Sequence, residues 1–120
     1  MTDTVTLKSN SDFRRIYARG KAYTNPALVI YLMKNRAGIC RIGITTSKKI
    51  GNAVERNRSK RVIRAAFRSI EREINGGYDI VFVARGRTKY TKSTVLCEIM
   101  RKNFLSAGVI KNDSSFNKAD

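Results

Sequence analysis

The chain has 120 residues, a net charge of +16 and a hydrophobic fraction of 42%. Its length and hydrophobic content predict one domain over residues 1–120 with a single modest core. The charge indicates a polyanionic partner, either nucleic acid or an anionic membrane surface. Because no apolar run approaches the ~20 residues of a membrane-spanning helix, nucleic acid is the favoured partner.

The N-terminal part of the chain predicts one short helix. Residues 1–8 are expected to be frayed, and since they contain no apolar segment typical of an export signal, a cytoplasmic location is expected. Ser9–Arg19 has a serine cap at its start and is followed by a terminating glycine. Phe13 and Tyr17 lie one turn apart on the side that also carries Ile16. Core packing explains Ile16, whereas the two aromatic residues fit either core packing or a wall that stacks on single-stranded RNA.

Two strands joined by a hairpin are predicted at Ala27–Met33 and Ile39–Thr45. Alternate side chains of the pair form a core face consisting of Leu28, Ile30, Leu32, Cys40, Ile42 and Ile44. The opposite face carries Val29, Tyr31, Met33, Arg41, Gly43 and Thr45. We therefore expect one face of the sheet to be core and the other to form half of a shallow groove.

The stretch Ser47–Arg68 concentrates the positive charge. Against one acid, Glu55, it holds eight basic residues: Lys48, Lys49, Arg56, Arg58, Lys60, Arg61, Arg64 and Arg68. Asn52 occupies an N-cap position, and Glu55, three residues later, completes a capping box. No Pro or Gly follows until Gly76, so a helix of up to about 22 residues is predicted from Ala53 onward.

At about 100° per residue this basic helix has two distinct faces. The apolar face consists of Ile63, Ala66, Phe67, Ile70 and Ile74. The opposite face consists of Asn57, Lys60, Arg61, Arg64, Arg68 and Arg72. Like charges three and four residues apart repel each other, and almost no acids relieve them. The pattern therefore indicates a phosphate-binding face rather than a solvated surface, and anions are also favoured at the positive end of the helix dipole, beside Lys48 and Lys49.

The C-terminal third predicts a strand and a helix. Tyr78–Ala84 is nearly all apolar, as in a buried central strand. The basic loop 85–89 reads as a solvated turn. A last helix starts from a Thr91 or Ser93 cap, runs to about residue 107 and carries a core stripe of Val95, Leu96, Ile99, Met100 and Phe104. Residues 109–120 are expected to be a disordered tail.

The residues that usually carry catalysis are scarce. There is no histidine, which excludes histidine acid–base chemistry and histidine metal ligation. The nine acids are scattered, whereas a metal-dependent nuclease needs several carboxylates converging on ions about 4 Å apart. Cys40 and Cys97 both lie in apolar patterns and are expected to be buried free thiols. Any reaction that involves this chain therefore takes its catalytic groups from elsewhere.

The segment KKIGNAVERNRSKRVIRAAFR, with Arg56-Asn57-Arg58 at its centre, resembles the arginine-rich segment of the protein component of bacterial ribonuclease P. The early helix with spaced aromatics and the two apolar strands resemble the same family, so the likeness extends over most of the chain. Two residues depart from the family pattern. Ser59 replaces an aliphatic residue and Thr46 replaces a valine, and neither departure removes a charged contact.

The resemblance implies an α+β fold, a single α/β sandwich with a mixed sheet of about four strands and three helices, like the second domain of ribosomal protein S5. It also implies a left-handed crossover at the basic helix, which spacing alone would not predict. In this family the RNA subunit is the catalyst, with Mg²⁺ bound to the holoenzyme and none to the protein alone. The protein is a monomer that pairs one to one with the RNA and assists 5′ maturation of precursor tRNA.

Carried over by position, the resemblance implies two sets of site residues. The catalytic RNA or nearby phosphates would meet Lys48, Lys49, Asn52, Arg56, Asn57, Arg58, Lys60, Arg61, Arg64 and Arg68. The single-stranded 5′ leader would lie in a groove lined by Phe13, Tyr17, Val29 and Tyr31.

Two other classes of protein share part of this pattern. A ribosomal or general RNA-binding protein has similar charge and fold, but need not combine a basic helix with an aromatic-lined strip. A DNA-binding protein would place the basic helix in a major groove, yet a single helix without a dimer signal leaves most of the chain unexplained.

Overall fold

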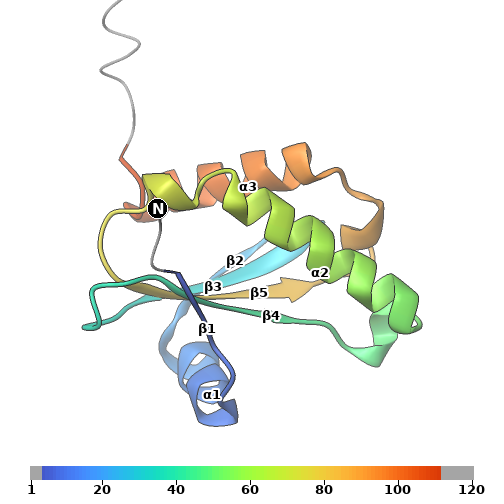
Figure 1. The fold of residues 1–120 in the computed structure, drawn as a ribbon, viewed down its shortest axis with the longest axis horizontal. Coiled ribbons are helices and arrows are strands. Elements are labelled where there is room, and N and C mark those ends of the chain that lie inside the picture. Colours follow the sequence, from blue (N-terminus) through green and yellow to red (C-terminus); the bar gives the residue numbers. More distant parts are fainter. Residues whose placement is uncertain (1–3, 112–120) are drawn as a thin grey trace, which may run out of the picture.

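A mixed sheet of five strands forms the middle layer of the computed structural model, which describes residues 4–111 (Figure 1). The strand order is β1-β4-β5-β3-β2. The strands are β1 Val5–Thr6, β2 Lys21–Thr24, β3 Leu28–Lys34, β4 Arg41–Thr45 and β5 Tyr78–Ala84. The helices are α1 Asn10–Arg19, α2 Ala53–Arg68 and α3 Ser93–Ala107, with short 3-10 turns η1 Lys48–Ile50, η2 Glu71–Glu73 and η3 Thr88–Tyr90. Helix α1 covers one face of the sheet, and α2 and α3 cover the other.

The main core lies between the sheet and the α2–α3 layer. As the alternation predicted, Leu28, Ile30 and Leu32 of β3 point into this core, while Tyr31 and Met33 point toward α1. Strand β5 lies at the centre of the sheet, antiparallel to β3 and parallel to β4, which confirms its predicted central position. Three phenylalanines join the layers: the ring of Phe82 on β5 lies 5.6 Å from that of Phe67 and 6.5 Å from that of Phe104.

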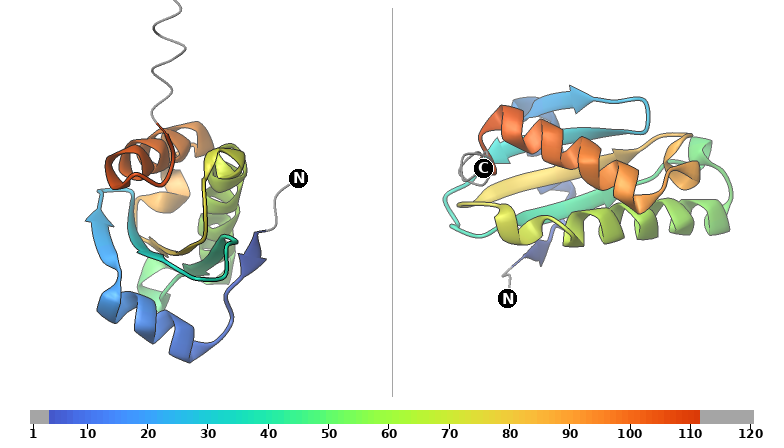
Figure 2. Two further views of the ribbon diagram at one scale, coloured as in Figure 1. Left: turned by 90° about the vertical axis from the view of Figure 1, so that its left-hand side faces the viewer. Right: turned by 90° about the horizontal axis from the view of Figure 1, so that it is seen from above.

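The connection β4-α2-β5 links two adjacent parallel strands. Viewed from the helix side, with both strands running left to right, β5 lies above β4 (Figure 2, right). That arrangement is a left-handed crossover, whereas nearly all such connections are right-handed. The fold class expected from the resemblance is therefore confirmed.

Two edge strands bring the sheet to five strands, where about four were expected. Val5 donates its N–H to Cys40 and Leu7 donates to Ile42, so the start of the chain pairs with β4 and buries Leu7. The expectation that residues 1–8 are frayed is wrong from Val5 to Leu7, and residues 1–3 lie outside the described part. Strand β2 was not predicted because its sequence has no apolar alternation. It is ordered by antiparallel pairing with β3.

The end of α3 corrects the predicted tail at its first two residues. Gly108 adopts a left-handed conformation with φ 79°, which turns the chain back so that Val109 and Ile110 are buried. Ile110 also forms a bridge with Ile74. The expectation of a disordered tail is therefore wrong at Val109 and Ile110, and residues 112–120 lie outside the described part. At the other end of α3 the N-cap is Lys92, rather than the Thr91 or Ser93 predicted.

Helix α2 is shorter than the 22 residues that the sequence allows. It ends at Arg68, and Ile70 leaves the helical region with φ −124° and ψ −2°. Ile70 is fully buried, and the following turn η2 brings Ile74 to its bridge with Ile110. Packing of Ile70 and Ile74 therefore ends the helix at Arg68, although the segment contains no Pro or Gly.

Candidate nucleic-acid interface

Polar contacts among Asn52, Glu55 and Lys89 hold the start of α2. The predicted capping box is present: Asn52 Oδ1 accepts from the Glu55 N–H at 2.9 Å, and Glu55 Oε1 accepts from the Asn52 N–H at 3.0 Å. Lys89 of η3, only 11% exposed, lies 3.1 Å from Glu55 Oε2 and also donates to the Ile50 carbonyl. The Asn52 N–H and Lys89 lower the pKa of Glu55. The positive end of the helix, where an external anion was expected, is therefore occupied by the protein's own carboxylate.

Residues predicted to meet RNA at this end of α2 fall into two groups. Asn52 and Arg56 also shape the helix start, because the Arg56 guanidinium donates to the Gly51 carbonyl at 2.7 Å. Asn52 retains its amide N–H₂ and Arg56 retains further N–H donors for an outside partner. Lys48 and Lys49 on η1 are exposed, and neither forms an ion pair with the described residues.

The outward face of α2 is an unpaired basic surface. Lys60, Arg64 and Arg68 line two adjoining hollows of about 100 and 250 Å³ between α2 and the edge of β1. Arg58 and Arg61 line a wider hollow of about 460 Å³ on the other flank, facing the start of α3. Within residues 4–111 none of these five basic side chains forms an ion pair. We call these five residues, together with Asn57, the α2 face.

One departure from the family pattern, Ser59, is fully buried beneath the α2 face. Its hydroxyl donates to the Glu55 carbonyl at 3.1 Å, so the polar group is satisfied within the helix. Because its side chain is buried, Ser59 forms no part of the exposed basic surface.

The residues predicted to line the aromatic groove lie on the opposite side of the sheet. Tyr17 of α1 meets Tyr31 of β3 edge to face, with ring centroids 4.9 Å apart. The Tyr17 hydroxyl lies 3.3 Å from the Thr45 hydroxyl, and Phe13 packs over Gly43, where an added Cβ would lie 2.5 Å from the phenyl ring. The rings of Phe13, Tyr17 and Tyr31 lie close together, and Val29, the fourth predicted groove residue, is two residues from Tyr31 on the same face of β3. Tyr17 is the most open of them, at 40% exposed.

A buried carboxylate anchors this groove. Asp79 at the start of β5 is 1% exposed and accepts from Arg41 at 2.7 and 2.9 Å, from Asn35 at 2.8 Å and from Arg15 of α1 at 2.9 Å. Burial alone would raise the pKa of Asp79, but the hydrogen bonds from Arg41, Asn35 and Arg15 outweigh it and hold that pKa below its usual range. Arg15 also pairs with Asp12 on the same helix. Asp79 thereby fixes α1 over the sheet.

Sequence reasoning missed this cluster, although a signal was present. Asp79 is an acid inside a strand predicted to be buried on both faces, and a buried carboxylate needs partners. Arg41, on the groove side of its strand and directly opposite Asp79 in the ladder, was the natural candidate.

The described part of the chain offers few groups for chemistry of its own. Within residues 4–111, no three His, Cys, Asp or Glu side chains are grouped so that they could hold a metal ion. Cys40 and Cys97 are free thiols, and burial raises the pKa of Cys40 to about 12, so it stays protonated at neutral pH. None of the helices formed by these residues has the length and apolarity needed to cross a membrane.

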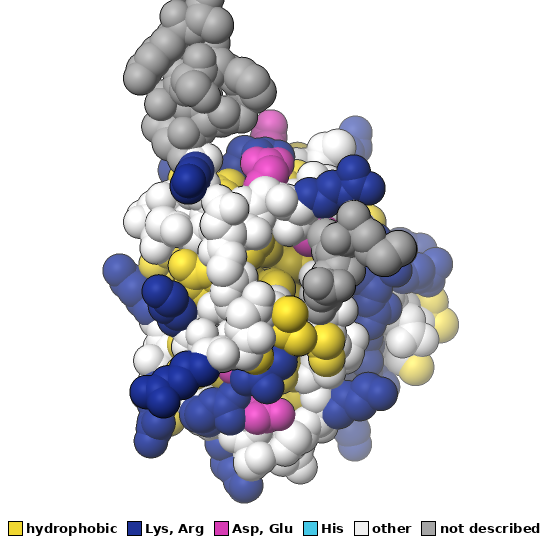
Figure 3. Space-filling model, turned by 60° about the vertical axis from the view of Figure 1, so that its left-hand side comes forward, with side chains coloured by type: hydrophobic (Ala, Val, Ile, Leu, Met, Phe, Trp, Pro, Cys, Tyr) yellow, Lys and Arg dark blue, Asp and Glu magenta, His cyan; other side chains and the backbone are white. Residues whose placement is uncertain are grey.

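The surface charge agrees with a polyanionic partner. On the face shown in Figure 3, Lys and Arg side chains are spread widely, and the acidic side chains visible there lie against basic ones. The basic charge that remains unpaired is therefore available to a ligand.

Comparisons with known proteins point to a single family. The family model for ribonuclease P matches residues 1–108. The ribonuclease P protein component of Clostridioides difficile is 50% identical over 84 residues, covering 69% of this chain and 74% of the relative. That of Clostridium kluyveri is 41% identical over 112 residues, covering 91% and 99%.

Solved structures agree with the sequence relatives. The ribonuclease P protein of Staphylococcus aureus superposes with a TM-score of 0.76 at 34% identity, covering 88% of this chain and 97% of that one. The protein from Thermotoga maritima superposes with a TM-score of 0.71 at 30% identity, covering 81% and 92%.

Proposed function

The chain belongs to the ribonuclease P protein family, the RNA-associated subunits of an endoribonuclease that processes tRNA, and from this membership we propose that its two surfaces bind different RNAs. The α2 face, with Lys48, Lys49, Asn52 and Arg56 at its end, binds the catalytic RNA. The aromatic groove binds the single-stranded 5′ leader of precursor tRNA.

One observation carries this division: the two surfaces lie on opposite sides of the sheet and differ in chemistry. The α2 face offers five unpaired basic side chains and no aromatic residue, which suits the phosphates of a structured RNA. The groove offers Tyr17 and Tyr31 beside paired charges, which suits unstacked bases. The leader fits this description because it is single-stranded, whereas the acceptor stem that follows it is a duplex whose bases are already stacked.

The chain supplies no catalytic group in this proposal. Five of its six described carboxylates have structural partners: Asp12 with Arg15, Asp79 with Arg41, Glu55 with the helix cap, Glu71 with Thr4, and Glu73 with Arg101. The sixth, Glu98, is an exposed single carboxylate on α3 and belongs to no cluster that could hold a metal ion. Together with the absence of histidine from the sequence, this leaves hydrolysis to the RNA subunit and its Mg²⁺. The proposal has one protein and one catalytic RNA per holoenzyme, acting on precursor tRNA in the cytoplasm.

Reconstitution tests the proposal directly. The purified chain is added to precursor tRNA and the host's ribonuclease P RNA at a magnesium concentration too low for the RNA alone, and cleavage at the mature 5′ end is scored. We expect cleavage only with both subunits, and an unchanged chemical step for the Glu71→Gln, Glu73→Gln double variant. Site-specific cleavage by the RNA-free protein would refute the assignment of catalysis to the RNA.

A further inference from the structure

Among residues 4–111, the two most exposed large hydrophobic side chains belong to segments that meet where α2 begins. Tyr90, the last residue of η3, is 76% exposed, and Val54 in the first turn of α2 is 65% exposed. Their sequence neighbours Lys89 and Glu55 form an ion pair at 3.1 Å. Figure 2 (right) shows the orange turn η3 beside the start of α2. The ion pair therefore holds both apolar residues at one end of the helix layer.

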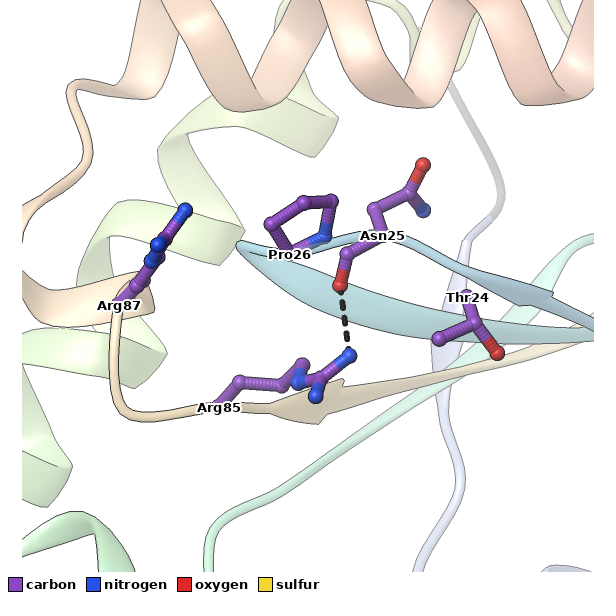
Figure 4. A pocket seen from close by; sticks show the side chains of 5 residues that line it. All are labelled: Thr24, Asn25, Pro26, Arg85 and Arg87. Atoms are coloured by element: carbon purple, nitrogen blue, oxygen red, sulfur yellow. Dashed lines mark hydrogen bonds between the residues drawn. The ribbon is translucent and has the colours of Figure 1, made fainter.

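The turn that carries this tyrosine is anchored to the rest of the fold. Before it, the Arg85 guanidinium donates to the Asn25 carbonyl of the β2–β3 turn at 3.0 Å (Figure 4). Within it, Thr88 is fully buried and Lys89 is only 11% exposed, so the loop predicted to be a solvated turn is solvated only in part. The Tyr90 ring is thus presented on a fixed support, and a ligand that covers it loses little affinity to ordering of the loop.

A cation holds the ring beside α2. The Lys89 ammonium lies 5.3 Å from the centroid of the Tyr90 ring and also donates to the Ile50 carbonyl, in the turn just before the helix. Cation–π attraction favours this arrangement. Because the ring is 76% exposed all the same, most of it stays open to a flat ligand.

Unpaired arginines border the same end of the helix layer. The hollow of about 460 Å³ between α2 and the start of α3 is lined by Arg58, Arg61, Val62, Ala65 and Ser93, none of which is acidic. Arg58 follows Val54 by four residues, so the two lie on one side of the helix about 6 Å apart along its axis. Ser93 follows Tyr90 by three residues, which limits the distance between their Cα atoms to about 11 Å. The ring and the arginines are therefore within reach of one small ligand.

An unstacked nucleotide matches this combination of groups. Its base can stack on the tyrosine ring while its phosphate meets a guanidinium. Proteins that recognise RNA commonly bind loops and bulges in this way, because their bases are free to stack on aromatic side chains. Since Arg58 and Arg61 belong to the α2 face, the RNA concerned is the one proposed to bind that face.

We propose that Tyr90, with Val54 and Arg58, forms a nucleobase-binding site for one unpaired nucleotide of the catalytic RNA. This rests on the proposed binding of the catalytic RNA to the α2 face. It adds a contact to a base at the edge of a surface that otherwise meets phosphates. The α2 face has no aromatic residue of its own, and η3 supplies the ring next to it.

The test measures the affinity of the catalytic RNA for the unmodified chain, Tyr90→Ala, Tyr90→Phe and Val95→Ala, an exposed apolar control on α3. We expect Tyr90→Ala to weaken binding by at least about 5-fold, as for the loss of one stacked base. Tyr90→Phe, which keeps the ring, and the control should bind as the unmodified chain does. Because a stacked base releases no counterions, Tyr90→Ala should leave the slope of log K against log salt unchanged, whereas Arg58→Ala should reduce its magnitude.

Base-specific chemical modification identifies the nucleotide. One unpaired base of the catalytic RNA should be protected by the unmodified chain and become reactive in the complex with Tyr90→Ala. Replacing that nucleotide by an abasic residue should weaken binding of the unmodified chain by the same factor as Tyr90→Ala. It should cause no further loss when combined with Tyr90→Ala.

Other results overturn the inference. If Tyr90→Ala binds normally while Arg58→Ala is weakened, the nucleobase site is wrong and the α2 face stands. If neither variant is weakened, the proposed binding of the catalytic RNA to the α2 face fails as well. If Tyr90→Phe loses as much affinity as Tyr90→Ala, or if no base couples to the ring, the contact is not stacking. A loss confined to precursor tRNA would assign the ring to the other RNA.

Discussion

The two faces of the sheet treat positive charge in opposite ways. On the α1 side, Arg15 and Arg41 converge on the buried carboxylate of Asp79. On the α2 side, Arg58 and Arg64 have no acidic partner among the described residues. The difference shows that charge count alone does not locate a ligand site, because arginines that are neutralised internally hold the fold, whereas exposed arginines without an acidic partner are available to an external anion.

The aromatic residues follow the reverse distribution. Tyr17 and Tyr31 border the α1 side, where charge is paired, and the outward face of α2 has none. This distribution supports the proposal that bases stack on the α1 side, where Arg15 and Arg41 are already paired, and that phosphates bind on the outward face of α2, which offers no aromatic ring. Substitutions that change one face and leave the other intact test whether base stacking and phosphate binding are independent.

Replacing Asp79 by Asn gives the largest expected effect. Breaking a buried ion pair leaves Arg15 and Arg41 without their partner, so the free energy of unfolding should fall by about 3 kcal/mol, the lower end for such changes because both arginines are one-third exposed. Urea unfolding measures it. The control is Glu73→Gln, which breaks the exposed pair with Arg101 and should cost less than about 1 kcal/mol. Equal losses in the two variants would mean that Asp79 does not anchor α1.

The same carboxylate predicts an acid dependence of stability. Because the folded-state pKa of Asp79 is lowered, its contribution is present above the unfolded pKa of about 3.9 and is lost as the pH falls through the folded-state pKa. The unmodified chain should therefore lose stability below about pH 4 more steeply than Asp79→Asn does. Unfolding curves for both proteins at successive pH values test this, and parallel pH profiles would contradict it.

The sequence predicted those parts of the molecule that local patterns determine. The capping box at Asn52, the faces of β3 and the end of α3 at Gly108 depend on residues close together in the chain, and all three are present. Edge strand β2 and the buried pair Val109–Ile110 were missed because their order comes from distant partners rather than from their own pattern.

The candidate sites show the same limit. The α2 face follows from helical periodicity, so its residues were predictable one by one. The anchoring of α1 joins Arg15 to Asp79, 64 residues apart, and the hydrogen bond from the Arg85 guanidinium to the Asn25 carbonyl joins two loops that are 60 residues apart. Periodicity contains no information on either contact, because each joins segments that are far apart in the chain.

The aromatic groove is tested by Tyr31→Ala. Loss of one stacking partner should weaken precursor tRNA binding by about 1–3 kcal/mol and leave mature tRNA, which has no leader, almost unchanged. Tyr23→Ala, which removes an aromatic ring from the opposite face of the sheet, is the control. The measurement is a pair of affinities for each reconstituted holoenzyme whose protein keeps its melting temperature. Equal losses of affinity for the two tRNAs would show that Tyr31 only packs against its neighbours and does not stack on the leader.

The α2 face predicts stabilisation by multivalent anions. Bound sulfate relieves the repulsion among Lys60, Arg64 and Arg68, and at ten times its dissociation constant it should add about 1.4 kcal/mol by mass action. The melting temperature should rise in sulfate well beyond its value in chloride of equal ionic strength. Identical melting curves in the two salts would show that the face binds no anion on its own.

The smallest expected change in the free energy of unfolding comes from Arg64→Ala. On an exposed helical position alanine has the higher propensity, and the substitution removes like-charge pairs with Lys60 and Arg68, so the free energy of unfolding should stay the same or rise by up to about 0.5 kcal/mol. Affinity for the catalytic RNA should nevertheless fall, and the slope of log K against log salt should decrease in magnitude by about 0.7–0.9 for the lost phosphate contact. Arg36→Ala removes one exposed charge from the hairpin between β3 and β4 and should leave that slope unchanged. A structural role for Arg64 would lower stability and affinity together, whereas loss of a phosphate contact lowers affinity without lowering stability, so the two measurements together decide between these roles.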